Sequence, residues 1–327
     1  MIVTDMLNDI YYQSDYASLY SDNDSEVFNF TFRQDENKIH FHSIKRPINF
    51  VAGQAVDGDY FDLETPYGYG GPVTNCHDKD FLSKAFKAYR VECQSQNIVC
   101  EFIRFHPFNP IMEHNQLFDF YAQERQVVIV DLSLPVEERW AKYSKTTRNI
   151  LRKANKKLNR ISDSKILGDF YSLYQQTMDK NNAAEFYYFK PEYFNKLIAI
   201  NNVDLLSITL DSEVVSTGFF MYGNELAHYH LSANNSDFLS ENGNYALLDY
   251  AFDQAKEYGC KWMMLGGGRT SDEMDSLFKF KKKFSDKILP FYIGGVTFLP
   301  QIREQLNQLW YEKHTDSTQR LFQQYRL

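Results

Sequence analysis

A stretch of four apolar residues near the middle of the chain constrains the fold most strongly. Residues 127–130 read Val-Val-Ile-Val, so this strand has no polar face and needs cover on both sides, as a central strand of a sheet has. Strand patterns and helical patterns alternate before and after it. Such alternation is typical of a sheet with helices packed on it. The sequence therefore predicts an α/β (α+β) fold, in which each half has a mixed central sheet flanked by helices.

The chain has 327 residues, which is above the size at which one hydrophobic core usually divides. We therefore expect two domains, the first at residues 1–135 and the second at residues 136–300. The pattern after residue 300 predicts a last helix over residues 301–325. The segment 301–327 would then close the chain as a helix that packs back on the first domain.

Periodicity and turn residues give the expected elements. The predicted helices cover residues 79–95, 135–161, 165–179, 191–200, 243–258, 272–284 and 301–325. The predicted strands cover residues 38–44, 99–105, 125–132, 203–210, 214–222, 225–233, 261–265 and 288–296. Gly223-Asn224 joins two of these strands and is a hairpin signal.

Composition limits the classes of function. The formal net charge is −8, whereas a protein that binds nucleic acid over a broad surface is normally basic, so any such contact is expected to be local. The four cysteines form no CxxC pair and predict buried, free thiols in a reducing compartment. The acidic, polar start and the lack of a run of about 18 apolar residues predict a cytoplasmic protein with at most peripheral membrane contact.

The predicted helix over residues 140–161 carries an unusual concentration of positive charge. At about 100° per residue its apolar side chains fall on one face. The opposite face has eight cations: Lys142, Lys145, Arg148, Arg152, Lys153, Lys156, Lys157 and Arg160. A solvated helix face is the simplest interpretation. The alternative is a strip that binds phosphates of a nucleotide-linked substrate or of a tRNA acceptor stem, with Arg148, Arg152 and Lys153 as candidate binding residues.

One lysine of the predicted helix 272–284 lies on its packed side. Leu277, Phe280 and Phe284 define the apolar face, and Lys281 projects between Leu277 and Met274. The other lysines of the segment point away: Lys279, Lys282 and Lys283. An inward lysine either extends to water or has a partner. It can also be functional, because a partly desolvated ammonium stabilises a developing oxyanion better than one in bulk water.

The strand over residues 225–233 and the helix start after it form a third candidate region. Strand alternation places His228, His230 and Ser232 on one face and Tyr229 on the other. Backbone N–H groups at a helix start can hold a phosphate or a polarised carbonyl. The residues that open this helix are Asn242, Gly243 and Asn244. A simple N-cap by one of the asparagines is the structural alternative.

Two glycine-rich turns complete the candidates. Tyr67, Tyr69, Gly70 and Gly71 combine close backbone approach with aromatic faces and hydroxyl groups. Gly266, Gly267 and Gly268 follow a predicted strand and are a plausible ligand turn. Both turns can equally be tight structural connections. His40 and His42 share a strand face, but no third ligand is evident, so we expect no metal site.

Five separated segments together resemble the Fem-ligase (FemAB/FemX) branch of the GNAT superfamily. They occur in that family's order and span about residues 60–296. The Arg-Asn-x-x-Arg-Lys-Ala helix and the Phe-Lys-x-x-Phe helix are the most specific. The segments are residues 62–72, 144–154, 228–233, 265–268 and 277–284.

The resemblance implies two GNAT-like domains with the transferase site in the cleft between them. It also implies transfer of an aminoacyl group from aminoacyl-tRNA, or an acyl group from coenzyme A, to a primary amine of a cell-envelope precursor such as a peptidoglycan precursor. Lys281 matches the lysine to which oxyanion stabilisation is attributed in that family. No permanently bound cofactor is implied. The long coiled-coil arm of the staphylococcal members has no room here, as in the FemX type.

The residues around these motifs leave the details open. Tyr67, Tyr69, Gly70 and Gly71 are expected to contact the acceptor, and residues 242–244 and 266–268 the donor. His230 and Tyr229 are candidates for the base, and a substrate group is another. Ser240-x-x-Gly243-x-Tyr245 departs from the GNAT pyrophosphate pattern (Q/R)xxGx(G/A), which counts against coenzyme A. The alternatives are an acyl-coenzyme A N-acyltransferase acting on an amino sugar of a surface glycan, and a non-catalytic two-domain binding protein.

Overall fold

The protein is described from a computed structural model, which describes residues 6–22 and 24–327. The chain divides into two compact units. Unit 1 contains Tyr11–Glu124 and Pro290–Leu327, and unit 2 contains residues 6–10 and Arg125–Leu289. The chain passes from unit 1 to unit 2 inside strand β8 (Phe120–Asp131) and returns inside β14 (Ile288–Thr297). The boundaries expected at residues 135 and 300 lie just after these strands, because no break in composition marks a transition inside a strand.

Unit 1 is built on a mixed sheet, as predicted. Its strand order is β1-β2-β5-β7-β14, and only the β5–β7 pair is parallel. The short β6 also pairs with β2, and β3 with β4. The bounds are β1 Glu26–Gln34, β2 Asn37–Pro47, β3 Phe50–Val51, β4 Gln54–Ala55, β5 Phe61–Glu64, β6 Val73–Thr74 and β7 Ile98–Arg104. Strand β1 has no counterpart among the predicted elements.

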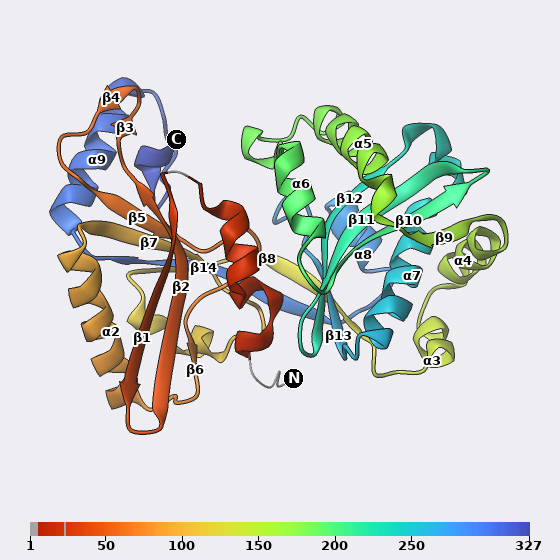
Figure 1. Cartoon of the computed structure of the whole chain (residues 1–327), viewed down its shortest axis with the longest axis horizontal. Helices are drawn as coiled ribbons and strands as arrows, with labels where there is room; N and C mark the ends of the chain where they lie inside the picture. Colours follow the sequence, from red (N-terminus) through yellow and green to blue (C-terminus); the bar gives the residue numbers. More distant parts are fainter. Residues whose placement is uncertain (1–5, 23) are drawn as a thin grey trace. The chain divides into compact units, whose positions relative to one another are not determined.

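Two helices cover the sheet of unit 1 (Figure 1). Helix α2 (Lys79–Ser95) starts where the Asp78 carboxylate accepts hydrogen bonds from two backbone N–H groups, and it buries Phe86 and Tyr89 against Phe41. Helix α9 (Pro300–Lys313) packs in a separate cluster through Leu306 and Trp310. The predicted helix over residues 301–325 is therefore too long, since the helix ends at Lys313.

The end of the chain is held to unit 1 by a buried carboxylate. Asp62 on β5 is fully buried and accepts hydrogen bonds from Tyr325, Arg326 and Arg46. A charge removed from water in this way is stable only because several donors compensate it. The last residues thus pack on the same unit as the segment 11–124.

The strands of unit 2 continue the same mixed sheet in the order β8-β13-β12-β11-β10-β9. Its β12–β13 pair is parallel and the other pairs are antiparallel. The predicted hairpin at Gly223-Asn224 is confirmed, because β11 and β12 pair on either side of it. The bounds are β9 Asn159–Ser162, β10 Val203–Leu210, β11 Glu213–Tyr222, β12 Leu226–Asn234 and β13 Trp262–Gly266.

Helices cover both faces of this sheet (Figure 1). Successive residues of β11 point to opposite faces, so Phe219 packs on Phe170 and Phe194, while Phe220 joins the core under α4 and α7. The central run at residues 127–130 is fully buried, as its apolar pattern predicts. The helices of unit 2 are α3 Val136–Ala141, α4 Lys145–Lys157, α5 Leu167–Lys180, α6 Pro191–Ile198, α7 Gly243–Glu257 and α8 Ser276–Lys281.

The single long helix predicted over residues 135–161 is wrong. The segment forms α3, then α4, and then strand β9. Ser144 ends the helical path because its hydroxyl accepts a hydrogen bond from the Thr147 N–H and so caps a new helix. Arg148 bridges the break, since its guanidinium donates to the carbonyls of Ala141 and Tyr143.

The remaining elements are short. Helix α1 (Ser14–Ala17) lies near the start of the chain. The 3-10 helices are Met6–Asn8, Ile10–Tyr12, Ser18–Tyr20, Pro110–Leu117, Ser164–Ile166, Glu185–Tyr187, Ser236–Glu241 and Gln324–Arg326. Within residues 6–22 and 24–327, no helix combines the length and apolar character needed to cross a bilayer. All four cysteines are free thiols; three are buried and Cys76 is half-buried.

Candidate functional site

Helix α8 places a lysine inside unit 2. The Asp275 carboxylate caps the helix by accepting hydrogen bonds from the Leu277 and Phe278 N–H groups. Phe278 and Lys281 lie one turn apart and both are buried, with Lys281 only 7% exposed. The prediction that Lys281 projects to the packed side is confirmed. The prediction that Lys281 lies beside Met274 is wrong, because Met274 precedes the helix and is 67% exposed.

The Lys281 amine has defined partners. Its Nζ donates a hydrogen bond to the Gly267 carbonyl at 2.8 Å and lies 5.6 Å from the centre of the Tyr229 ring. Burial, followed by the charge of Arg125, lowers the pKa of Lys281 to about 7, while Asp275 acts in the opposite direction. An amine with this pKa exchanges its proton near neutral pH, which is unusual for lysine.

The turn at Gly266–Gly268 forms the other side of this cluster. Gly266 has a φ of +76°, which favours glycine. At Gly267 a Cβ would lie 2.7 Å from Arg125 Cδ and 2.8 Å from the Gln126 carbonyl oxygen, so no larger residue fits. Arg125 Nη1 donates to the Gly268 carbonyl at 2.7 Å. Two basic side chains thus hold the turn: Lys281 donates to the carbonyl of Gly267 and Arg125 to that of Gly268.

Strand β12 brings Tyr229 to Lys281 but directs His230 elsewhere. The pairing with β11 shifts at this point, since Phe219 faces Leu231 while Phe220 faces Tyr229. His230 is the extra residue of this bulge, so the regular alternation expected along β12 breaks there. The Tyr229 hydroxyl donates to the Ser232 hydroxyl, and His230 Nε2 pairs with the Tyr193 hydroxyl at 2.8 Å.

The two residues predicted as bases differ from Lys281 in their protonation. Burial, followed by the charge of His228, lowers the pKa of His230 to about 3. Burial raises the pKa of Tyr229, and the hydrogen bond to Ser232 opposes this only in part. A general base works best with a pKa near the operating pH. The pKa of His230 is too low for it to take up a proton efficiently, and the pKa of Tyr229 is too high for it to form the phenolate that would act as the base.

The helix start at residues 242–244 is tightly built. Asn242 has a φ of +58° and its side chain donates to the Ser240 carbonyl, so it does not cap the helix with its side chain. A Cβ at Gly243 would lie 2.5 Å from a methyl carbon of Val215. Tyr245 follows as a buried residue, its hydroxyl accepts a hydrogen bond from Lys283, and its ring packs against Phe280 of α8 at 5.1 Å. The start of α7 and helix α8 are therefore neighbours.

The predicted acceptor loop belongs to unit 1. Tyr67 and Tyr69 are half-buried, and Gly70 and Gly71 are buried. The Tyr69 ring meets Tyr11, His106 and Phe291 edge-on, with ring centres 5.3 to 5.6 Å apart. Gly70 exchanges backbone hydrogen bonds with the strand segment at residues 104–106. The loop thus has a fixed conformation, and its role in binding remains a prediction.

The basic face on α4 is narrower than the sequence predicts. Lys157 pairs with Glu241, and Arg160 lies on β9, where it pairs with Asp249 and Asp253. Arg148 is occupied by carbonyls of the chain break before α4. Within the described chain, four exposed cations of α4 have no ion pair: Lys145, Arg152, Lys153 and Lys156. We call these four residues the α4 basic face.

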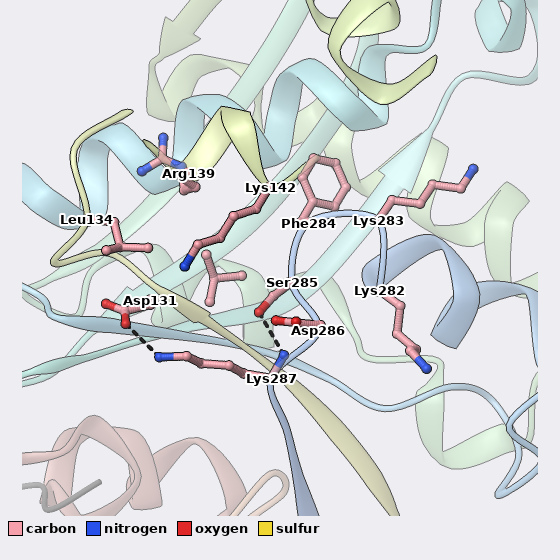
Figure 2. Close-up of a pocket in the computed structure, with 11 residues that line it drawn as sticks. Asp131, Leu134, Arg139, Lys142, Lys282, Lys283, Phe284, Ser285, Asp286 and Lys287 are labelled. Atoms are coloured by element: carbon pink, nitrogen blue, oxygen red, sulfur yellow. Dashed lines mark hydrogen bonds and ion pairs between the residues drawn. The ribbon is translucent and has the colours of Figure 1, made fainter. Parts of the chain in front are cut away.

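A cavity of about 130 Å³ lies in unit 2 beyond the end of α8 (Figure 2). Lys287 lines it and is paired with Asp131 at 2.6 Å. The ammonium groups of Lys282 and Lys283 point away from this pair (Figure 2). Since Lys281 is not part of its lining, we place the candidate catalytic site at Lys281 and not in this cavity.

Two residues of the Lys281 cluster escaped sequence reasoning. The sequence places Arg125 only on a strand and Asp275 in the interior of a predicted helix. The sequence Asp-Ser-Leu-Phe at 275–278 does carry an N-cap signal, an aspartate directly before an apolar helical stretch. Arg125 gives no local signal, because its partner Gly268 lies 143 residues further along the chain.

Comparison with known proteins gives a clear result for the fold. No protein-family model matches the sequence, and no curated protein matches it. A crystal structure of FemX matches with a TM-score of 0.73 and 12% identity over 92% of this chain and 94% of that chain. The C-terminal domain of a putative lysylphosphatidylglycerol synthetase from Agrobacterium fabrum matches with a TM-score of 0.55 and 15% identity, over 90% and 91% of the two chains. L-PGS from Bacillus licheniformis matches with a TM-score of 0.50 and 14% identity, over 84% and 86%.

At these identities the likeness concerns the fold. It agrees with the two α/β units and the large mixed sheet described above. The chain has the fold of FemX, so the fold that the resemblance in its sequence implies is confirmed.

Proposed function

We propose that the chain is an N-acyltransferase of the Fem type, which moves an aminoacyl or acyl group from an activated donor to a primary amine of a cell-envelope precursor. The observation that carries the proposal is Lys281, a buried amine with a pKa of about 7. Perturbed lysines of this kind concentrate at functional sites. The free thiols favour a reducing compartment, and we place the reaction in the cytoplasm.

The reaction needs one cation at the right place. The acceptor nitrogen attacks the donor carbonyl carbon, a C–N bond forms, and the carbonyl π pair moves to the oxygen. Collapse of this intermediate re-forms the carbonyl and breaks the bond to the leaving group, an ester oxygen or a thiolate sulfur. The proton lost by the amine ends on that leaving group. The negative charge on the carbonyl oxygen exists only near the transition state, so stabilising it accelerates the reaction.

Lys281 suits the task of holding this oxyanion. An ammonium has three N–H donors, and Gly267 takes one of them. Its surroundings largely exclude water, which strengthens the interaction with a developing negative charge. Lys281 is therefore the catalytic cation of the proposal, with Tyr229 shielding it from one side.

The same environment argues for a substrate group as the proton acceptor. His230 has a pKa of about 3 and is engaged with Tyr193. A donor-linked hydroxyl or the leaving group itself can take the proton of the attacking amine without a protein base. The proposal therefore assigns no base to His230 or to Tyr229.

Tyr245 favours an aminoacyl ester over a coenzyme A thioester as donor. It occupies the position where the GNAT pyrophosphate pattern has a small residue, and its side chain is buried against Phe280. A large, fixed ring at this place leaves less room for a pyrophosphate at the start of α7. We therefore propose aminoacyl-tRNA as donor, with the α4 basic face as a contact for its phosphates and Tyr67 or Tyr69 as a contact for the acceptor.

A donor comparison tests the proposal. Purified protein is incubated with charged tRNA or with acetyl-coenzyme A, each together with a nucleotide-linked muropeptide amine or with an amino sugar, and the products are identified by mass spectrometry. We expect an acceptor enlarged by one aminoacyl residue, only with charged tRNA. Transfer from coenzyme A to the amino sugar would support the alternative enzyme. A ligand bound without any transfer would support the non-catalytic alternative.

The α4 basic face gives a second test. The double change Arg152→Gln and Lys153→Gln should weaken tRNA binding by about tenfold at low salt, because phosphate contacts release counterions, and by less at high salt. Fluorescence anisotropy with labelled tRNA measures both affinities. Lys157→Gln is the matched control on the same helix, since Lys157 is already paired with Glu241. If the double variant and the wild type bind tRNA equally well at low salt, the α4 basic face is only a solvated helix face.

A further inference from the structure

We infer that Arg125 is a positioning residue for Lys281. It holds the glycine turn that accepts the hydrogen bond of the Lys281 amine, and it places a positive guanidinium near that amine. The effect of Arg125 on catalysis rests on the proposed function. Its effect on Lys281 does not, since Arg125 and Lys281 both belong to unit 2 and bind consecutive residues of one turn.

The contacts around the turn are close on both sides. The Arg125 side chain lies directly over Gly267, where a Cβ would come within 2.7 Å of Arg125 Cδ. Its Nη1 donates to the Gly268 carbonyl at 2.7 Å, while Lys281 Nζ donates to the Gly267 carbonyl at 2.8 Å. At Gly268 a Cβ would lie 2.6 Å from a carboxylate oxygen of Asp275. Moving Arg125 therefore displaces the acceptor of the Lys281 hydrogen bond.

Among the residues that the structure describes, three groups with charge or titratable protons face Lys281 from the elements around it. Arg125 comes from β8, Tyr229 from β12, and Asp275 from the N-cap of α8. Tyr229 stays a neutral phenol, because burial raises its pKa. The charge on Lys281 is opposed first by burial and then by Arg125, and it is favoured by Asp275.

This balance predicts the sign of the effect of removing Arg125. A nearby positive charge disfavours a second one, so it lowers the pKa of the lysine amine. Without the guanidinium, burial and Asp275 remain, and the pKa of Lys281 should rise from about 7. Arg125 thus adds to the effect of burial and lowers the pKa of the Lys281 amine further. If removing Arg125 only distorted the turn, the pKa of Lys281 could change in either direction.

A direct titration of Lys281 tests the inference. Protein labelled with carbon-13 in its lysines is titrated, and the Lys281 Cε resonance is assigned by its loss in Lys281→Met. Arg125→Gln should raise the pKa of Lys281 by about one unit or more, and Arg125→Lys should keep it near the wild-type value because the charge remains. The titration needs neither donor nor acceptor, so it decides the inference even where no transfer activity is found.

Arg269→Gln is the matched control. Arg269 also approaches Asp275, with Nε 3.9 Å from Oδ2, but its side chain is 55% exposed and solvent screens its charge. This change should leave the pKa of Lys281 in place. If the function holds, the alkaline fall of kcat/KM should move to higher pH in Arg125→Gln and stay in place in Arg125→Lys. Equal shifts of the pKa in Arg125→Gln and Arg125→Lys, or no shift in Arg125→Gln, would overturn the inference.

Discussion

Lys281→Met should lower kcat by about 100- to 1000-fold, the usual cost of losing one oxyanion donor. The change keeps the length of the side chain and removes its charge. Substrate binding should change little, because the oxyanion that Lys281 stabilises exists only near the transition state. Turnover at saturating donor and acceptor is the quantity to measure. Only the ammonium form can serve, so wild-type kcat/KM should also fall as the pH rises above about 7.

Lys279→Met is the control for this prediction. Lys279 lies on the same helix, two residues earlier, and is exposed. Lys283 suits this purpose less well, since it donates a hydrogen bond to Tyr245 and lies over the Phe280 ring. Near-wild-type turnover of both Lys281→Met and Lys279→Met would remove the catalytic residue from the proposed function. A loss in Lys281→Met alone would support it.

The orientation of Lys281 was predictable because it depends on local geometry. Residues three apart on a helix share a face, and Phe278 and Lys281 are buried together for this reason. The predicted start of the helix at residue 272 is wrong, so Met274 does not share this face: it precedes the Asp275 cap. In the same way, Leu151 and Ala154 are buried as their spacing predicts, even though the long helix is interrupted at Ser144.

The chemistry around Lys281 depended on contacts that no local pattern encodes. The partners of the lysine come from β8, β12 and the turn after β13, which are brought together only by the order of strands in the sheet. The bulge at His230 is a property of the pairing between β11 and β12, so strand alternation alone places Ser232 opposite Tyr229, although their hydroxyl groups are hydrogen-bonded. Helical periodicity is therefore enough to single out Lys281, whereas the groups around it can be known only from the folded structure.

Lys281→Met should stabilise the protein at neutral pH, in the opposite direction to its effect on turnover. Unfolded, the lysine has its ordinary pKa of 10.5, and folded it has a pKa of about 7. Between these values the unfolded state binds more protons, so wild-type stability rises as the pH rises through this window. The shift corresponds to a cost on the order of 4 kcal/mol at pH 7.

The variant removes this cost but leaves the Gly267 carbonyl without its donor, which costs about 1–3 kcal/mol. A difference between two pH values is therefore the sharper quantity, because the loss of the hydrogen bond is common to both. The stability advantage of Lys281→Met over wild type should shrink by about 3 kcal/mol between about pH 7 and about pH 9.5. Urea unfolding at the two pH values measures it.

Lys279→Met again serves as the control, since its stability relative to wild type should be the same at both pH values. A constant difference for Lys281→Met as well would mean that Lys281 keeps an ordinary pKa when folded and extends to water. A lysine retained only for packing would make the Met variant less stable at every pH. A protein that gains stability and loses turnover through one change has kept a costly buried charge, and catalysis supplies the physical reason for keeping it.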